Sequence, residues 1–269
     1  MKFYLFAKFF QDLSADRLME TCLELGLDGP TLLLRDGYWC RPDELSDIPA
    51  FVKTARDHGI NVTYADTSFM PGRDKEIEKV YGTLADNGIE KIRLDYIGKK
   101  TPCRELPETA RRLMENAEAL GRKFGVRSIV QIHGDMYPHN ATSAYFAIKD
   151  LDPKYVGVKM DPGNNIQQEG EEKYWYQAEL LGEYIAALGA KSATMVRGED
   201  GRILREFVPA QEGLVDYTEV YRCLLKAGFD GPNILMPFYD SDGGEKRADH
   251  LKGEISYLKQ CLKEAREEK

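Results

Sequence analysis

Long apolar runs are missing from this sequence of 269 residues: none approaches the ~20 residues that a membrane-spanning helix needs. The apolar start at 1–10 (MKFYLFAKFF) is short, is interrupted by Lys8, and precedes no small-residue cleavage site. We interpret it as a strand and not as a signal peptide. We therefore expect no membrane partner and a cytoplasmic location.

The chain also lacks closely spaced cysteines and an excess of basic residues. The five cysteines are widely spaced and form no CxxC pair, which argues against a disulfide framework or a structural zinc and favours free thiols in a reducing compartment. Acidic residues outnumber basic ones by 45 to 37, and no basic stripe stands out, so we expect no nucleic-acid partner. The 42% apolar and 30% charged residues are typical of a globular domain.

Six times along the chain, a glycine ends an amphipathic segment and a short apolar run follows it. These glycines stand in LGLD (25–28), HGIN (58–61), NGIE (87–90), FGVR (124–127), LGAK (188–191) and AGFD (227–230). Glycine suits the left-handed position just past a helix end. The pattern predicts strands at 3–9, 31–35, 61–66, 90–96, 127–133, 155–161, 192–197 and 232–238. It predicts helices at 14–25, 46–58, 74–87, 107–124, 142–150, 173–188, 216–227 and 244–265.

Eight strand–helix units with apolar strands predict an α/β fold, a (β/α)₈ TIM barrel, and we expect one domain over 1–269. The alternative is an open, doubly wound sheet. The absence of GxGxxG and GxxxxGK[ST] after the first strand weakens the nucleotide-binding form of that alternative.

A barrel of this kind places its active site at the carboxyl ends of its strands. Polar side chains stand at most of the predicted strand ends: Lys8, Arg35, Asp66, Arg93, Asp95, Tyr96, Gln131, His133, Lys159, Asp161, Asn164, Arg197 and Glu199. His133, Lys159 and Asp161 lie within or at the end of apolar runs, where ionisable groups cost stability unless they are paired. These three residues predict a working pocket.

Three phrases, VGVKMDPGNN (156–165), IVQIHGD (129–135) and FVPAQEGLVDYTEVYRCLLKAGFDGPNIL (207–235), resemble the xylose isomerase-like barrel superfamily of sugar phosphate isomerases and epimerases. The resemblance covers almost the whole chain. It implies an isomerase or epimerase that binds a divalent metal through Glu, Asp, His and Glu on barrel strands 5 to 8. In the pattern that the resemblance implies, the metal coordinates neighbouring substrate oxygens, and the two glutamates transfer a proton between carbons.

This sequence departs from that ligand set. Aligned with the family pattern, the four positions hold Gln131, Asp161, Met195 and Met236, so only the aspartate is kept. Glutamine cannot abstract a proton, and methionine is a soft ligand that suits copper(I) better than magnesium or manganese. We expect either no metal or a weakly held Mn, Mg or Zn ion on Asp161. We interpret the two methionines as the apolar floor of the pocket.

We predict that His133 is the acid/base of a proton transfer next to a carbonyl and that Asp161 and Lys159 set its charge state. Gln131, Asn164 and Arg197 would hold hydroxyls or a phosphate of a carbohydrate substrate. Further substrate-binding candidates are Glu199, Asp66, Asp95 and Trp175. The oligomeric state stays open, and a homo-oligomer is compatible with this class of barrel.

Plainer interpretations compete with these roles. Asp161 precedes Pro-Gly and would cap the following turn, and Lys159 would pair with Asp161 or Asp95. Trp175 would pack in the core or at an interface. Two other functions also compete: a non-catalytic sugar-binding or regulatory barrel, and an aldolase or lyase that uses Lys159 as a Schiff-base amine.

Overall fold

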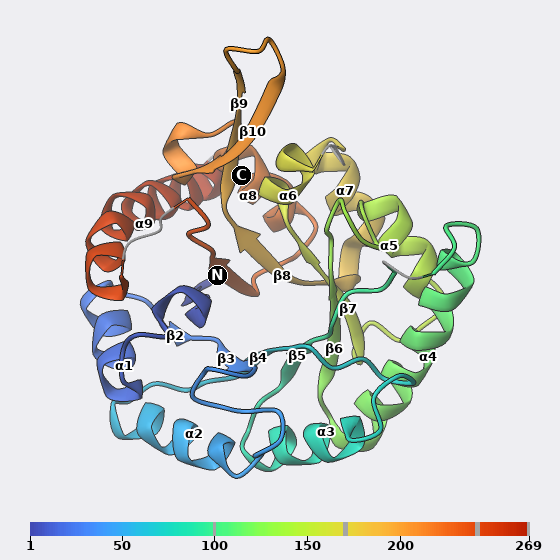
Figure 1. The fold of residues 1–269 in the computed structure, drawn as a ribbon. Coiled ribbons are helices and arrows are strands. Elements are labelled where there is room, and N and C mark those ends of the chain that lie inside the picture. The colour runs from blue at the N-terminus through green and yellow to red at the C-terminus, as the bar shows by residue number, and fades with distance from the viewer. Residues whose placement is uncertain (99–100, 169–171, 240–242, 268–269) are drawn as a thin grey trace.

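Parallel strands form the centre of the molecule, and helices surround them as a ring (Figure 1). The computed structural model describes residues 1–98, 101–168, 172–239 and 243–267. The central strands are β1 (Lys2–Leu5), β2 (Gly29–Pro30), β3 (Leu32–Leu34), β4 (Tyr64–Thr67), β5 (Lys91–Arg93), β6 (Arg127–Gln131), β7 (Val156–Met160), β8 (Ile185–Ala190) and β11 (Pro232–Leu235). The helices are α1 (Ala15–Glu24), α2 (Asp47–Asp57), α3 (Ile77–Asp86), α4 (Leu106–Phe124), α5 (Ala141–Ile148), α6 (Pro162–Gln167), α7 (Tyr174–Leu181), α8 (Tyr217–Lys226) and α9 (Gly244–Glu267).

The sheet closes on itself through one short segment of chain. Its strand order is β2-β1-β11-β8-β7-β6-β5-β4-β3, and only Thr31 separates β2 from β3. One half of this segment pairs with β1, and the other half pairs with β4. Because β2 and β3 together occupy one position, the nine strands fill the eight strand positions of a parallel barrel, which confirms the predicted (β/α)₈ fold.

Two apolar clusters hold this architecture together. The larger one lies between the sheet and the helices, where α1 contributes Leu18, Met19 and Cys22, all fully buried. The smaller one fills the barrel and includes Tyr4, Leu33, Tyr64, Ile129 and Ile234. Because side chains fill the barrel, it is a packed core, and chemistry is confined to the strand ends.

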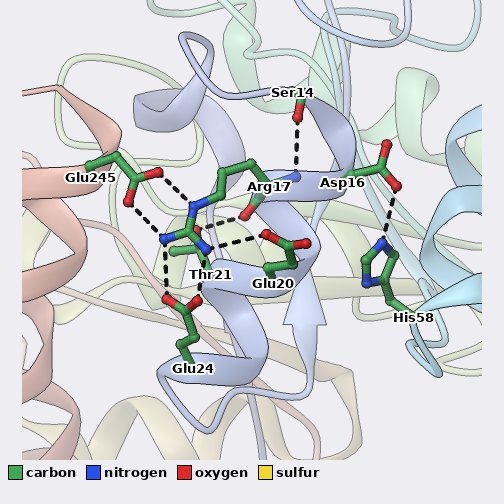
Figure 2. Close-up of polar contacts among 8 residues, drawn as sticks. All are labelled: Ser14, Asp16, Arg17, Glu20, Thr21, Glu24, His58 and Glu245. Atoms are coloured by element: carbon green, nitrogen blue, oxygen red, sulfur yellow. Dashed lines mark hydrogen bonds and ion pairs between the residues drawn. The ribbon is translucent and has the colours of Figure 1, made fainter.

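The two ends of the chain meet in the ring. Figure 2 shows the guanidinium of Arg17 on α1 between Glu24 of the same helix and Glu245 of α9, with donor–acceptor distances of 2.7 and 2.6 Å. Asp16 accepts a 3.1 Å contact from the ring of His58, which follows α2 (Figure 2). These exposed contacts join α1 to both of its neighbours.

The barrel strand expected at 192–197 is wrong. The strand at the seventh barrel position is β8. Residues 192–197 form β9 (Ser192–Arg197), which pairs antiparallel with β10 (Ile203–Val208) in a hairpin. This hairpin projects away from the barrel (Figure 1). The helix expected to reach 188 ends at Leu181. The run YIAALGA (184–190) is rich in alanine and leucine, which favour helices, and long-range pairing with β7 and β11 makes it a strand instead.

Smaller differences lie near the strand ends. Residues Ala7–Phe10, expected as strand, form a 3-10 turn, and α6, which was not expected, follows β7 directly. No helix in the described ranges is long and apolar enough to cross a membrane. All five cysteines are free thiols, as the sequence predicted.

Candidate active site

A pocket of about 190 Å³ opens at the carboxyl ends of the barrel strands. It is lined by Phe6, Lys8, Arg35, Arg93, Tyr96, Gln131, His133, Asn164, Gln168, Lys191, Phe207, Met236 and Phe238. Ligand sites for drug-sized molecules measure ~300–1,000 Å³, so this pocket suits a small molecule. The pocket brings together three of the predicted site residues, Gln131, His133 and Asn164.

Asp161 lies buried just beneath the floor of this pocket and accepts donors on both carboxylate oxygens. Its Oδ1 accepts from the backbone N–H of Asn164 at 2.9 Å, which caps α6, as the plainer interpretation of Asp-Pro-Gly predicted. Its Oδ2 accepts from Nε2 of Gln131 at 2.6 Å and lies 3.1 Å from Nζ of Lys191. Both members of this ion pair are almost inaccessible to water. Burial lowers the pKa of Lys191, and the charge of Asp161 opposes this shift.

A second charged layer lies beneath the first. Lys159, on β7, is fully buried, and its Nζ is 4.0 Å from Oδ1 of Asp66, which also accepts from Nε of Arg93 at 3.1 Å. The partner of Lys159 is therefore Asp66, where the sequence suggested Asp161 or Asp95. Burial lowers the pKa of Lys159 to about 8, with Asp66 and Asp161 acting in the opposite direction. Neither Lys159 nor Asp66 lines the pocket.

His133 follows β6 and lies against polar neighbours on one side of the pocket. Gln168 accepts from the backbone N–H of Gly134 through Oε1 at 2.6 Å, which turns its Nε2 toward Nε2 of His133 at 3.2 Å. An amide nitrogen only donates, so this network assigns the neutral ring an acceptor at Nε2 and a proton at Nδ1. The Tyr96 ring packs edge-on against the His133 ring, with the ring centroids 4.7 Å apart. The Tyr96 hydroxyl donates to Oε1 of Gln131 at 3.3 Å. Burial raises the pKa of Tyr96, which keeps this donor protonated.

Four other predicted site residues lie outside the pocket. Arg197 and Glu199 belong to the end of the β9–β10 hairpin, where Arg197 donates to the carbonyl of Gly201 at 2.7 Å. Asp95 pairs with Arg73. Trp175 is 54% exposed and lines a cavity of about 300 Å³ between α7 and α8, away from the strand ends. Their roles in binding substrate stay predictions that the geometry does not support.

The ligand position on the seventh barrel strand changes because that strand is β8 and not 192–197. Met195 is 40% exposed on the hairpin and does not line this pocket, so its expected place at the pocket floor is wrong. On β8 the inward position at that depth is Gly189, where an added Cβ would meet Asp161 Oδ2 at 3.1 Å and Met236 Sδ at 3.2 Å. Met236 does line the pocket, as expected. Lys191, just past β8, lines the pocket and is the candidate site residue that the sequence did not predict.

The residues present do not fit the divalent metal that the resemblance implies. The carboxylate of Asp161 receives an amide N–H from Gln131 and an ammonium N–H from Lys191, and these donors repel a cation. The other two ligand positions hold glycine and methionine, which offer no hard oxygen or nitrogen donor. In the described ranges, no three His, Cys, Asp or Glu side chains gather in a way that would hold a metal ion.

The fold and the pocket define a (β/α)₈ barrel whose polar site lies at the strand ends. Residues 19–261 match the family described as the xylose isomerase-like TIM barrel. The chain therefore belongs to this family, which confirms the resemblance seen in the sequence. No curated protein sequence matches the chain.

Solved structures with the same fold cover nearly all of the chain. One is a xylose isomerase-like TIM barrel protein from Mycobacterium smegmatis in complex with magnesium (19% identity, TM-score 0.67, 94% of this chain and 92% of that one). A second is D-psicose 3-epimerase from Clostridium cellulolyticum H10 with D-tagatose (16%, 0.68, 97% and 99%). A third is L-ribulose 3-epimerase (15%, 0.74, 99% and 96%). At these identities the likeness establishes the fold alone.

Proposed function

We propose that this protein is an isomerase- or epimerase-like enzyme that moves a proton next to a carbonyl of a small carbohydrate derivative. The observation that carries the proposal is the ammonium of Lys191, 3.1 Å from Asp161 at the floor of a pocket that His133 also lines. A cation placed where an oxyanion develops makes the neighbouring C–H more acidic. Lys191 would supply that charge where relatives use a metal.

The remaining pocket residues have distinct roles in this proposal. His133 would accept the proton from carbon at Nε2, with the amide of Gln168 giving way to substrate, and would return it to the adjacent carbon on the same face. Asn164 donates to the carbonyl of Ile132 at 3.0 Å, while its buried Oδ1 has no hydrogen-bond partner in the described part of the chain. A buried acceptor without a donor is costly, so Asn164 is ready to receive a substrate hydroxyl.

An aldolase or lyase that uses Lys159 is a second candidate. Burial lowers the pKa of Lys159 to about 8, and Nζ has no hydrogen-bond partner among the described residues, so part of this amine is neutral at mildly alkaline pH. The pocket lining does not include Lys159, which makes this the weaker candidate. Borohydride would trap a substrate adduct on Lys159 if this candidate holds, and an unchanged protein mass would dismiss it.

Hydrogen exchange tests the main proposal without knowledge of the product. The protein is incubated in D₂O with a panel of ketoses, aldoses, sugar acids and sugar phosphates, and deuterium next to the carbonyl is followed by NMR. We expect exchange that persists after EDTA treatment and that falls at least ~100-fold in His133→Gln. His139→Gln, an exposed histidine outside this pocket, is the matched control.

Three outcomes separate the hypotheses. Exchange that EDTA abolishes would mean that a metal does the work proposed for Lys191. Ligand binding without exchange would support the regulatory or sugar-binding alternative. If the exchange rate of His133→Gln stays within about threefold of the wild-type rate, His133 is not the acid/base. We also propose a cytoplasmic location, which the five free thiols support.

A further inference from the structure

Four cationic side chains converge on the pocket from four different strand ends. Lys8 follows β1, Arg35 follows β3, Arg93 ends β5 and Lys191 follows β8. No carboxylate is among the described residues that line the pocket, since both nearby aspartates lie beneath its floor. This positive lining stands out in a chain whose net charge is −8.

Two of these cations lie beside a carboxylate, and two do not. Arg93 pairs with Asp66, which also faces Lys159, and Lys191 pairs with Asp161. Lys8 and Arg35 have no carboxylate within ion-pair distance in the ranges that the structure describes, and their side chains donate to no acceptor there. Both residues are half-buried. The mouth of the pocket therefore carries about two unbalanced positive charges.

The surroundings of Lys8 show that these charges act on one another. Burial, followed by the charges of Arg35, Lys191 and Arg93, lowers the pKa of Lys8. Among the described residues, the favourable partners of its Nζ are two aromatic faces, with ring centroids at 5.5 Å for Phe9 and 5.3 Å for Phe238. Mutual repulsion between ordered, partly desolvated cations costs free energy, and a bound anion would remove that cost.

The pocket walls strengthen attraction to an anion. Phe6, Phe207 and Phe238 line it, and Nζ of Lys191 lies 4.4 Å from the centroid of the Phe238 ring. Aromatic walls exclude water and lower the local dielectric, so charges interact more strongly than at the open surface. The guanidinium of Arg35 offers paired N–H donors that match two oxygens of a carboxylate or phosphate.

We propose that the pocket binds an anionic carbohydrate derivative, a sugar acid or sugar phosphate, whose carboxylate or phosphate is held by Lys8 and Arg35. This inference rests on the proposed function for its choice of a carbohydrate. It adds the substrate class and two specificity-determining residues. With the anion held at the mouth, the carbonyl end of a small substrate lies toward Lys191 and His133, and neutral sugars are poor ligands.

Titration calorimetry on the full chain tests the anion site. The probes are ribose, ribonate, ribose 5-phosphate and inorganic phosphate, which share or lack the carbon skeleton and the charge. We expect at least one charged sugar to bind ~10-fold or more tightly than ribose, and to weaken as salt rises from 0.05 to 0.5 M. Ribonate binding without ribose 5-phosphate binding assigns a carboxylate, and the reverse assigns a phosphate.

Two variants locate the site. Lys8→Met and Arg35→Met should each weaken binding of the charged sugar at least ~5-fold. The surface variants Lys53→Met and Arg111→Met should leave it unchanged, because both residues are exposed and distant from the pocket. Thermal unfolding of each variant checks that the fold is retained. Equal affinity for ribose and the charged sugars, no binding of either charged sugar at 10 mM, or unaltered binding in both pocket variants would overturn the inference.

Hydrogen exchange in the same variants keeps the two proposals separable. If the wild type exchanges no substrate hydrogen but binds a charged sugar, and Arg35→Met loses that binding, the anion site is supported and the proposed enzymatic activity is excluded. Exchange that is equally fast with neutral and charged sugars would uphold the enzyme and remove the anion site.

Discussion

Replacing Lys191 with methionine tests the central feature of the site, the buried pair of Lys191 and Asp161. Removing one partner of a buried ion pair costs ~3–5 kcal/mol, because the other charge is left without compensation. Asp161 keeps two donors, Nε2 of Gln131 at 2.6 Å and the N–H of Asn164 at 2.9 Å. We therefore expect a loss at the lower end of that range, about 3 kcal/mol of unfolding free energy.

Urea unfolding at pH 7, followed by far-UV circular dichroism, measures this loss. Asp161→Asn removes the other charge and keeps a residue that caps helices well. The double variant should therefore be more stable than the sum of the two single losses predicts, by ~2 kcal/mol. Lys53→Met, an exposed lysine paired with Asp57, is the control and should change stability by less than ~0.5 kcal/mol. A loss below ~1 kcal/mol in Lys191→Met, or strict additivity in the double variant, would refute the ion-pair reasoning.

Three further predictions concern groups close to the site. Lys159 releases its proton at a pKa of about 8 in the folded state and at 10.5 when unfolded, so the unfolded chain binds more protons in this window and stability rises with pH. Compared with Lys159→Met in parallel urea titrations, the wild type should gain ~2 kcal/mol between pH 7.5 and 9.5, and a constant difference would contradict this. Glu254 on α9 is buried, which raises its pKa from 4.5 to about 7, while it accepts from Tyr239 and the N–H of Ala210. The favourable contribution of Glu254 to the free energy of unfolding is fully present below pH 4.5 and is lost as pH rises through 7. Glu254→Gln should therefore be more stable than wild type at pH 8 by ~1–3 kcal/mol and show no gain at pH 4.5. Equal stability of the two proteins at both pH values would argue against this prediction. Gly189→Ala should lower the thermal midpoint by an amount equivalent to ~1–2 kcal/mol, since its Cβ would crowd Asp161 and Met236, and an unchanged midpoint would mean that the interior relaxes freely.

Local patterns in the sequence were sufficient to predict most of the barrel. The glycines past the helix ends divide the chain into strand–helix units, and seven of the eight expected strands overlap strands of the barrel. Gln131 and His133, two residues apart at the end of one apolar run, both line the pocket. These features depend on residues close together in the chain, so single-sequence reasoning reaches them.

The seventh strand depends on distant residues, and its prediction failed for that reason. The run at 184–190 has the composition of a helix and becomes β8 because β7 and β11 pair with it on both sides. The segment Gly-Glu-Asp-Gly at 198–201, between two alternating runs, is a turn signal that pointed to a hairpin. Reading it would have moved the strand end back to Lys191 and placed this lysine at the rim.

Pairing between charges was equally hidden from the sequence. Asp66, Lys159 and Arg93 lie on β4, β7 and β5, and only barrel closure brings them to one layer. A sequence shows that each group ends a strand, and it cannot show which groups meet. The aspartate that accompanies Lys159 was therefore misassigned, although the cost of burying an unpaired lysine correctly indicated that a partner exists.

The substitutions at the metal positions are consistent with one another when their charges are considered together. In the pattern that the resemblance implies, a dication faces two glutamates and an aspartate. Here Gln131 and Met236 stand where the glutamates are expected, and Lys191 supplies a single positive charge to the remaining Asp161. Three carboxylates beside a single ammonium would leave a buried excess of negative charge, which is costly. One carboxylate beside one ammonium is balanced. Because Asp161 already balances Lys191 at the floor, the unpaired cations at the mouth, Lys8 and Arg35, leave the pocket with a net positive field, and that field selects the charge of the ligand.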